Sequence, residues 1–166
     1  MKELFAKRSV RAFKPDPIEQ NKIEILLKAA MCTSTSENQN EWEYVVVTDP
    51  QLLSSLSQIS PYTACIKDSP LAIVLLANTD STSLSDSWEQ KTSAATEAIL
   101  LECVHLDMTG VWFGISPMTE RMAFVSKLFK LPENLKPFAI TAIGYPLNKE
   151  DMDREFNFST VHYNGY

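Results

Sequence analysis

Four residues near the start of the chain have the types and the spacing of a phosphate-binding segment: Lys7, Arg8, Ser9 and Arg11. An arginine guanidinium can donate two parallel hydrogen bonds to phosphate oxygens, and a serine hydroxyl can donate another. The first fourteen residues hold five of the fifteen Lys and Arg residues and one acid, which makes this segment +4. The rest of the chain must then carry −10 to reach the net charge of −6. This asymmetry favours a local anionic ligand, and the alternative is a solvated basic turn.

Side chains for other kinds of chemistry are scarce. The chain has only four glycines, too few and too widely spaced for a dinucleotide-binding or a Walker loop. The two histidines, His105 and His162, lack further ligands at metal-binding spacing, so no metal site is expected, and His105 is interpreted as a helix-end residue. Cys32 has no histidine that could activate it and is interpreted as a buried helical thiol. No catalytic side chain is therefore expected, and an enzyme of this composition would depend on a bound cofactor.

Composition is typical of one globular domain covering residues 1–166. Apolar residues make up 45% of the 166 positions and charged residues 22%. No apolar run approaches the roughly 18 residues of a membrane span, and charges occupy the place of a signal-peptide core. The three cysteines are odd in number and widely spaced, which predicts buried free thiols and a cytoplasmic protein. The acidic balance argues against a nucleic-acid partner.

Periodicity and turn signals predict a mixture of helices and strands without strict alternation, so the fold class is α+β. A short helical turn is expected at 2–8, with Leu4 and Phe5 facing inward, and its end overlaps the phosphate-binding segment. Asp16 and Pro17 are expected to cap a helix that ends near Met31. The expected strands are 42–48, 71–77, 110–115 and 138–143, and further helices are expected at 50–58, at 88–107 and from Thr119, with an irregular connection at 61–68.

The tail over residues 148–166 shows no period but is rich in apolar side chains, among them Phe156, Phe158 and Tyr163. Such a segment must fold back over its own core or lie across a second subunit.

Several segments together resemble one family, the FMN-dependent nitroreductases. Lys7 to Phe13 is similar to the family's R-R-S-x-R-x-F, and 38–47 resembles its N-x-Q-P-W-x-(F/Y)-x-V-V. Val111-Trp112-Phe113-Gly114 resembles the strand that brings backbone N–H groups to the flavin ring. Gly144-Tyr145-Pro146 matches the family's G-Y-P, and Arg154 with Val161-His162 matches its C-terminal basic residue before V-H.

The resemblance implies a three-layer α-β-α sandwich around a mainly antiparallel sheet, in an intertwined homodimer with flavin at the subunit interface. The tail would then extend over the partner subunit. The implied cofactor is FMN, with NADH or NADPH as electron donor and no nucleic acid or membrane as partner. The flavin-binding residues implied are Lys7, Arg8, Ser9, Arg11, Ser34, Thr35, Ser36, Asn38, Asn40, Trp112, Phe113, Gly114 and Arg154.

The resemblance further implies a ping-pong oxidoreductase that takes hydride onto flavin N5 and reduces a small-molecule acceptor such as a nitroaromatic or a quinone. Two alternatives stay open: a flavin- or small-ligand-binding homodimer without physiological reductase activity, and other flavin chemistry such as dehalogenation. The first rests on two departures from the family pattern. One is the loop from Ser34 to Glu41, where Pro-Ser is common at Ser34-Thr35 and Gln-Pro at Asn40-Glu41, and the other is Asp107 and Thr109, where glycines are common.

Overall fold

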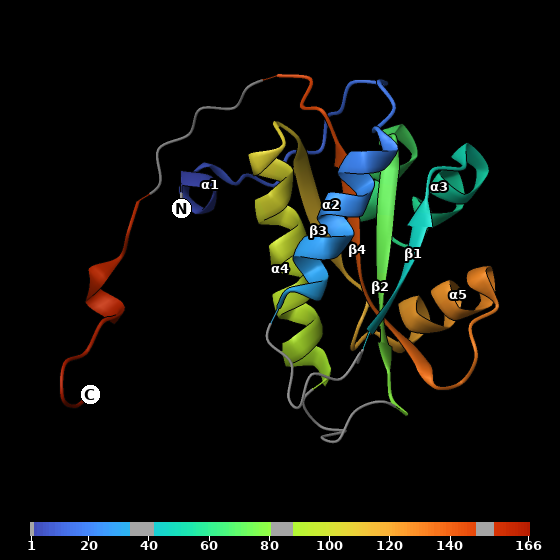
Figure 1. The fold of residues 1–166 in the computed structure, drawn as a ribbon. Coiled ribbons are helices and arrows are strands. Elements are labelled where there is room, and N and C mark those ends of the chain that lie inside the picture. Colours follow the sequence, from blue (N-terminus) through green and yellow to red (C-terminus); the bar gives the residue numbers. More distant parts are fainter. Residues whose placement is uncertain (1, 34–41, 81–87, 149–154) are drawn as a thin grey trace.

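The computed structural model describes residues 2–33, 42–80, 88–148 and 155–166 (Figure 1). Four strands form its sheet: β1 (Trp42–Val47), β2 (Leu71–Asn78), β3 (Thr109–Gly114) and β4 (Leu135–Gly144). The helices, in chain order, are α1 (Lys2–Ala6), α2 (Gln20–Met31), α3 (Pro50–Leu56), the 3-10 helix η2 (Pro61–Asp68), α4 (Trp88–His105), α5 (Thr119–Phe129) and the 3-10 helix η4 (Phe158–Thr160).

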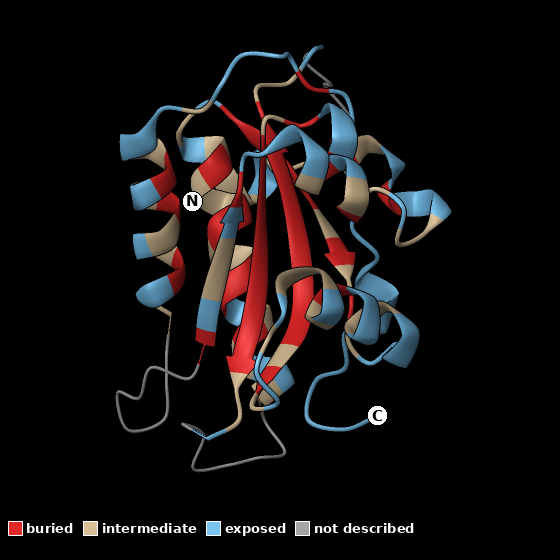
Figure 2. Cartoon of the chain, turned by 90° about the vertical axis from the view of Figure 1, so that its right-hand side faces the viewer, coloured by how far each residue is buried: buried red, intermediate tan, exposed pale blue. Residues whose placement is uncertain are grey.

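All strand pairs are antiparallel, in the order β1-β2-β4-β3. Strands β2 and β4 occupy the centre and are almost wholly buried, as Figure 2 shows in red. Their apolar runs of β-branched and aliphatic residues suit strands that are covered on both faces. The sheet therefore confirms the predicted α+β class, and it leaves β1 and β3 as edge strands.

Helices cover both faces of the sheet and make it the middle of three layers. On one face α2 and α4 pack over Ile73 and Ile143, with Leu26 and Ile99 contributing from the helices. On the other face α3, η2 and α5 enclose a second cluster that includes Val125. The α-β-α arrangement expected from the resemblance is thus confirmed.

Local signals for helix ends agree with the structure in one case and disagree in another. Asp49 caps α3, because its carboxylate accepts hydrogen bonds from the backbone N–H groups of Gln51 (2.9 Å) and Leu52 (3.0 Å). The predicted cap at Asp16 is wrong, since α2 begins at Gln20 with Glu19 at its N-cap position and no side-chain cap.

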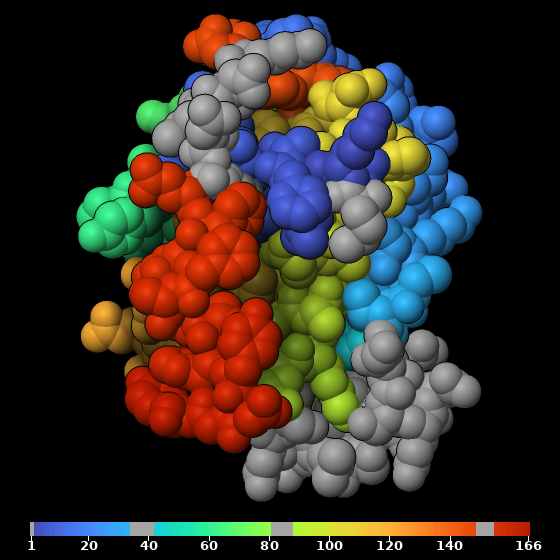
Figure 3. Space-filling view, turned by 90° about the vertical axis from the view of Figure 1, so that its left-hand side faces the viewer, coloured from blue at the N-terminus to red at the C-terminus, as the bar shows by residue number. Residues whose placement is uncertain are grey.

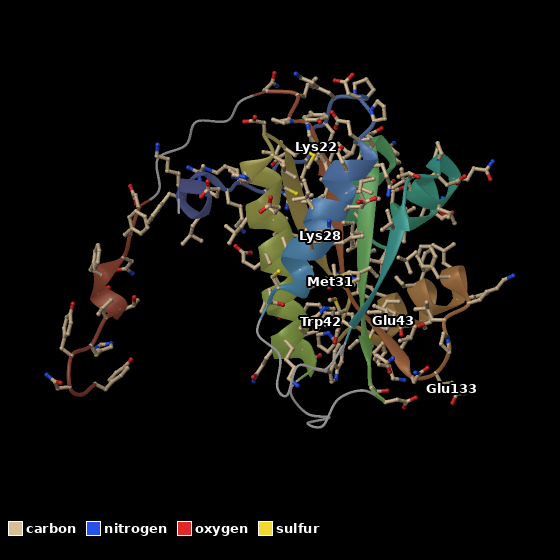
Figure 4. The ribbon with its side chains drawn as sticks, viewed as in Figure 1. Lys22, Lys28, Met31, Trp42, Glu43 and Glu133 are labelled. Carbon is tan, nitrogen blue, oxygen red and sulfur yellow. The ribbon has the colours of Figure 1, made fainter. Side chains whose placement is uncertain are left out.

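The start of α2 is held by a tertiary contact. Tyr145, directly after β4, accepts a hydrogen bond from Lys22 Nζ (2.5 Å) and donates one to Glu19 Oε2 (2.6 Å). Lys22 also lies over the Tyr145 ring, 4.9 Å from its centroid. Figure 4 shows Lys22 near the first turn of α2, at the end opposite to Met31. This network joins α2 to the end of the central strand β4.

Several predicted burials are wrong. Phe5 is 59% exposed and Leu4 is half-buried, so α1 does not pack inward as expected. All three cysteines are free, but only Cys103 is buried, while Cys65 is half-buried and Cys32 is exposed directly after α2. Helix α2 ends one residue before Cys32, so this side chain is not held on the inward face of the helix.

Residues 155–166 stand away from the sheet of their own chain, at the left of Figure 1. Figure 3, viewed from that left-hand side, shows this segment in red in front of the rest of the molecule. Every one of these residues is exposed, including the large apolar side chains Phe156, Phe158, Val161, Tyr163 and Tyr166. One contact to the body of the molecule is an edge-to-face pair between Phe5 and Phe156, with ring centroids 6.4 Å apart. The tail does not fold back over its own core.

Candidate functional site

The basic segment, residues 7–11, lies against the start of β3. Ser9 forms a parallel bridge with Gly110, and the Thr109 hydroxyl donates a hydrogen bond to the Arg8 carbonyl (3.4 Å). Beyond the segment, Phe13 forms an antiparallel bridge with Pro146. The tertiary structure therefore places the N-terminal cations beside the edge strand that carries the other predicted flavin contacts.

The cationic side chains of this segment differ in their surroundings. Lys7 forms an ion pair with Glu97 of α4 (3.2 Å). Arg8 donates from Nη1 to the carbonyl oxygens of Phe5 (2.7 Å) and Lys7 (2.9 Å), which curls α1 around its guanidinium. Arg11 is exposed and donates to the Ser9 carbonyl at 3.3 Å. Of the three, Arg11 has the most solvent access for an incoming anion.

Arg11 also lies near η2. Burial raises the pKa of the Cys65 thiol, and the positive charge of Arg11 acts in the opposite direction. The Arg11 guanidinium is thus within electrostatic reach of residues on the side of the molecule opposite to α1.

The open edge of β3 presents backbone groups at alternate residues. Ile115, one residue past β3, donates its N–H to the Phe138 carbonyl (2.9 Å), which makes this a hydrogen-bonded pair. Directly opposite residues alternate between hydrogen-bonded and non-bonded pairs in an antiparallel ladder. Phe113 is therefore bonded to β4, whereas the N–H and C=O groups of Trp112 and Gly114 point away from it. We call the outward groups of these two residues the β3 edge.

The outward C=O and N–H groups of Gly114 have different surroundings. The Gly114 carbonyl accepts a hydrogen bond from Arg121 Nη1 of α5 (2.9 Å). The Gly114 N–H points in the same direction as this carbonyl, as both groups of one residue do in an extended strand. The β3 edge thus offers the Gly114 N–H as a donor beside a guanidinium.

The three residues predicted from the Trp112-Phe113-Gly114 motif point in different directions. Phe113 is buried in the core shared with α5, on the face opposite to α4. Trp112 is half-buried and packs edge-on against Phe138, with centroids 5.7 Å apart, and Trp88 of α4 packs on the same ring at 6.0 Å. The Phe113 side chain and N–H both face protein, so the geometry favours Trp112 and Gly114 as the ligand-facing pair.

The two glycines of β3, Gly110 and Gly114, differ in how much room a Cβ would have. A Cβ at Gly110 would lie 2.8 Å from Leu100 Cδ2, so close packing of α4 on β3 accounts for that residue. Among the described residues a Cβ at Gly114 would meet Met118 Cε at 3.7 Å and Ser116 O at 3.9 Å, which are ordinary contacts. Packing within this described part does not require a glycine at 114, and space remains beside the β3 edge.

The turn before β3 accommodates the two departures from the family pattern. Asp107 adopts a left-handed conformation with φ of 58°, which aspartate tolerates better than most residues. Thr109 is buried, and its hydroxyl contacts the basic segment. The turn is formed without the family's glycines.

The other predicted flavin-binding residues, Ser34, Thr35, Ser36, Asn38, Asn40 and Arg154, lie outside the described residues. Sequence reasoning missed Glu97 and Arg121 as neighbours of the site. Arg121 stands seven residues after Gly114 on an exposed helix, and no motif distinguished it from an ordinary surface cation.

Within the part of the chain that the structure describes, no group of three or more His, Cys, Asp or Glu residues could hold a metal ion. Nor is any helix among these residues long and apolar enough to cross a membrane.

An antiparallel sheet between two helical layers, with a basic segment beside an edge strand, defines a class of three-layer α+β protein. Comparisons with known proteins place the chain within the class. The model of the Nitroreductase family matches residues 4–66. A protein of Archaeoglobus fulgidus, provisionally named NADH dehydrogenase/NAD(P)H nitroreductase, is 33% identical over 166 residues, covering 98% of this chain and 95% of that protein.

Solved structures give the same result for the fold. A protein of Clostridium acetobutylicum, provisionally named NADH oxidase, superposes with a TM-score of 0.94 at 40% identity and 99% coverage of both chains. An FMN-dependent nitroreductase of Clostridium difficile superposes with a TM-score of 0.91 at 26% identity over the full length of both chains. The chain belongs to the nitroreductase family and has its fold.

Proposed function

We propose that this protein is an FMN-dependent oxidoreductase that takes reducing equivalents from NADH or NADPH and passes them to a nitroaromatic, quinone or related small-molecule acceptor. The observation that carries the proposal is the alignment of the basic segment and the Gly114 N–H along one open strand edge. Membership of the nitroreductase family and the name of the Clostridium difficile relative support it.

The described residues fit FMN along β3. Near its start Ser9 bridges to Gly110, and Arg11 follows two residues after Ser9, so a doubly anionic phosphate there would meet a hydroxyl and a cation. Gly114 lies four residues further along β3, or roughly 13 Å at the rise of an extended strand. The free space over Gly114 suits the edge of a flat ring, because no side chain of its own fills it.

The protein's contribution would be binding and orientation. When bound, FMN supplies the redox chemistry by accepting and releasing electrons at its ring. Arg11 and Ser9 would hold the phosphate, the Gly114 N–H would donate to an acceptor atom of the ring, and Trp112 would border the ring. We assign no general acid or base, consistent with the scarcity of such side chains noted in the sequence.

We further propose that the protein works as a homodimer in which residues 155–166 lie over the second copy. The five large apolar side chains of this tail are exposed and stand away from their own sheet. Exposed apolar side chains gathered in one segment mark a surface for interaction with another protein.

The absorption spectrum of the purified protein and steady-state oxidation of NADH and NADPH test the enzymatic proposal. We expect a yellow protein that oxidises at least one nucleotide in the presence of a nitroaromatic or quinone panel. A colourless protein that does not bind added FMN would refute the proposal. Flavin that stays bound but is reduced by neither nucleotide would instead favour the alternative of a flavin-binding dimer without reductase activity.

A further inference from the structure

Arg121 stands out among the cations near the β3 edge because its interaction is with a backbone carbonyl. It lies in the first turn of α5, is half-buried, and donates from Nη1 to the Gly114 carbonyl at 2.9 Å. Among the described residues no carboxylate forms an ion pair with it. The guanidinium therefore adds positive charge beside the Gly114 carbonyl.

This contact changes what the β3 edge offers to a ligand. An uncovered strand edge presents N–H donors and C=O acceptors side by side. At Gly114 the acceptor is occupied by Arg121, and the donor remains directed along the same edge. At Gly114 itself, the edge therefore offers an N–H donor beside a guanidinium, which favours a ligand edge made of acceptor atoms.

The other described contacts next to Gly114 do not involve its carbonyl oxygen. The Ser116 hydroxyl is directed to the Glu89 carboxylate. Both the N–H of Ile115 and that of Ser116 donate to the Phe138 carbonyl, at 2.9 and 3.0 Å. These contacts hold the chain after β3 in place, but none of them covers the Gly114 carbonyl.

We propose that Arg121 is a positioning residue for the flavin ring. By occupying the Gly114 carbonyl, it orients the adjoining peptide and leaves the Gly114 N–H for the acceptor edge of oxidised FMN, where ring N5 and the neighbouring carbonyl oxygen carry lone pairs. Without Arg121, the exposed Gly114 carbonyl would face those lone pairs and repel them. This inference rests on the proposed FMN binding and adds a residue from α5 to it.

The test compares FMN affinity and bound-flavin spectra of full-length variants after removal of the flavin. Arg121→Met removes both the hydrogen bond and the charge, and we expect FMN affinity to fall about tenfold, the size of one hydrogen bond. Arg121→Lys keeps a donor and should stay within about threefold of wild type. Lys127→Met on the same helix is the control, because Lys127 is exposed and lies on a later turn.

The visible bands of the bound flavin separate positioning from folding. They should shift in Arg121→Met, since the hydrogen bonding at the ring changes, and stay unchanged in Arg11→Ala, which acts at the phosphate end. Should Arg121→Met fail to fold, Arg121→Gln, which keeps an amide donor without the charge, replaces it, with an expected affinity between those of the Met and Lys variants.

Wild-type affinity and wild-type bands in both Arg121→Met and Arg121→Gln would overturn the inference. So would a loss of affinity matched by a lower melting temperature of the FMN-free protein with unchanged bands, which would indicate a structural role only. Failure of the wild-type protein to bind FMN would overturn the proposed function itself, an outcome distinguishable from the other two.

Discussion

Phe13 lies directly against Gly144, so that a Cβ at 144 would be 2.8 Å from Phe13 Cδ1 and 3.0 Å from Phe13 Cβ. The ring of Phe13 is buried, and Pro70 closes the same space with its Cδ at 2.9 Å. Phe13 is the first residue after the basic segment to bridge to the end of β4, through Pro146. The contact joins the phosphate end of the candidate site to the central sheet.

We predict that Gly144→Ala destabilises the protein by about 1–3 kcal/mol, because the extra methyl group overpacks the contact with the buried Phe13 side chain and the Pro70 ring. Chemical denaturation monitored by circular dichroism measures this. Gly114→Ala in the FMN-free protein is the control, since the described atoms nearest to a Cβ there are 3.7 Å away, and it should leave stability within about 0.5 kcal/mol. Equal stability of the two variants would contradict the close contact.

Gly114→Ala should separate ligand binding from folding. The nearest atoms to its new methyl group are 3.7 Å away, so we expect stability of the FMN-free protein within about 0.5 kcal/mol of wild type. FMN affinity should fall, since the methyl group occupies the space beside the β3 edge. Fluorescence titration of FMN and thermal melting of the same samples provide the two measurements. Wild-type affinity would place the ring elsewhere.

Arg11→Ala should weaken FMN binding by about 1.5–3 kcal/mol, the range for hydrogen bonds to charged groups. Among the described residues the exposed Arg11 side chain donates one long hydrogen bond, to the Ser9 carbonyl, so the fold should tolerate its loss. Lys28→Ala, which removes an exposed cation from the outward side of α2, is the matched control and should bind FMN as wild type does. Comparable affinities for the two variants would assign another purpose to the basic segment.

Deletion of residues 155–166 tests the proposed dimer. We expect the truncated protein to lose the dimer and to aggregate, because the surface that the tail covers on the second copy becomes exposed. Light scattering coupled to size-exclusion chromatography measures the mass in solution. A truncated protein that dimerises as tightly as the full chain would remove the tail from the interface.

The contact between Tyr145 and Glu19 predicts an acid-dependent stability. Hydrogen bonding from the Tyr145 hydroxyl, with Lys22 also nearby, lowers the pKa of Glu19 in the folded state. A lowered folded pKa means that the stabilisation is present above the unfolded pKa and is lost as the pH falls through the folded value. Tyr145→Phe should therefore melt below wild type near neutral pH, and the difference should shrink below about pH 4. A difference independent of pH would contradict this pairing.

Local signals in the sequence determined much of the secondary structure and the outline of the site. The apolar run of β2 and the aspartate-proline pair before α3 depend on neighbours in the chain, so these elements were predicted within a residue or two. The clustering of Lys7, Arg8 and Arg11 and the resemblance to the nitroreductases indicated the ligand class, because charge and motif are properties of short segments. The cap at Asp16 and the burial of Phe5 and Cys32 were wrong, since each depends on how α1 and α2 are placed on the rest of the molecule.

Only the tertiary structure decided which backbone groups of β3 face the proposed ligand. The phase of hydrogen bonding between β3 and β4 directs the Gly114 N–H outward and the Phe113 N–H inward, and a shift of one residue would reverse them. The contact from Arg121 to Gly114 depends on how α5 packs on the sheet. The sequence of α5 does not by itself predict a contact with Gly114. Composition and motifs thus determine the kind of ligand, whereas strand register and helix packing determine the atoms that meet it, because these are long-range consequences of burying the whole core.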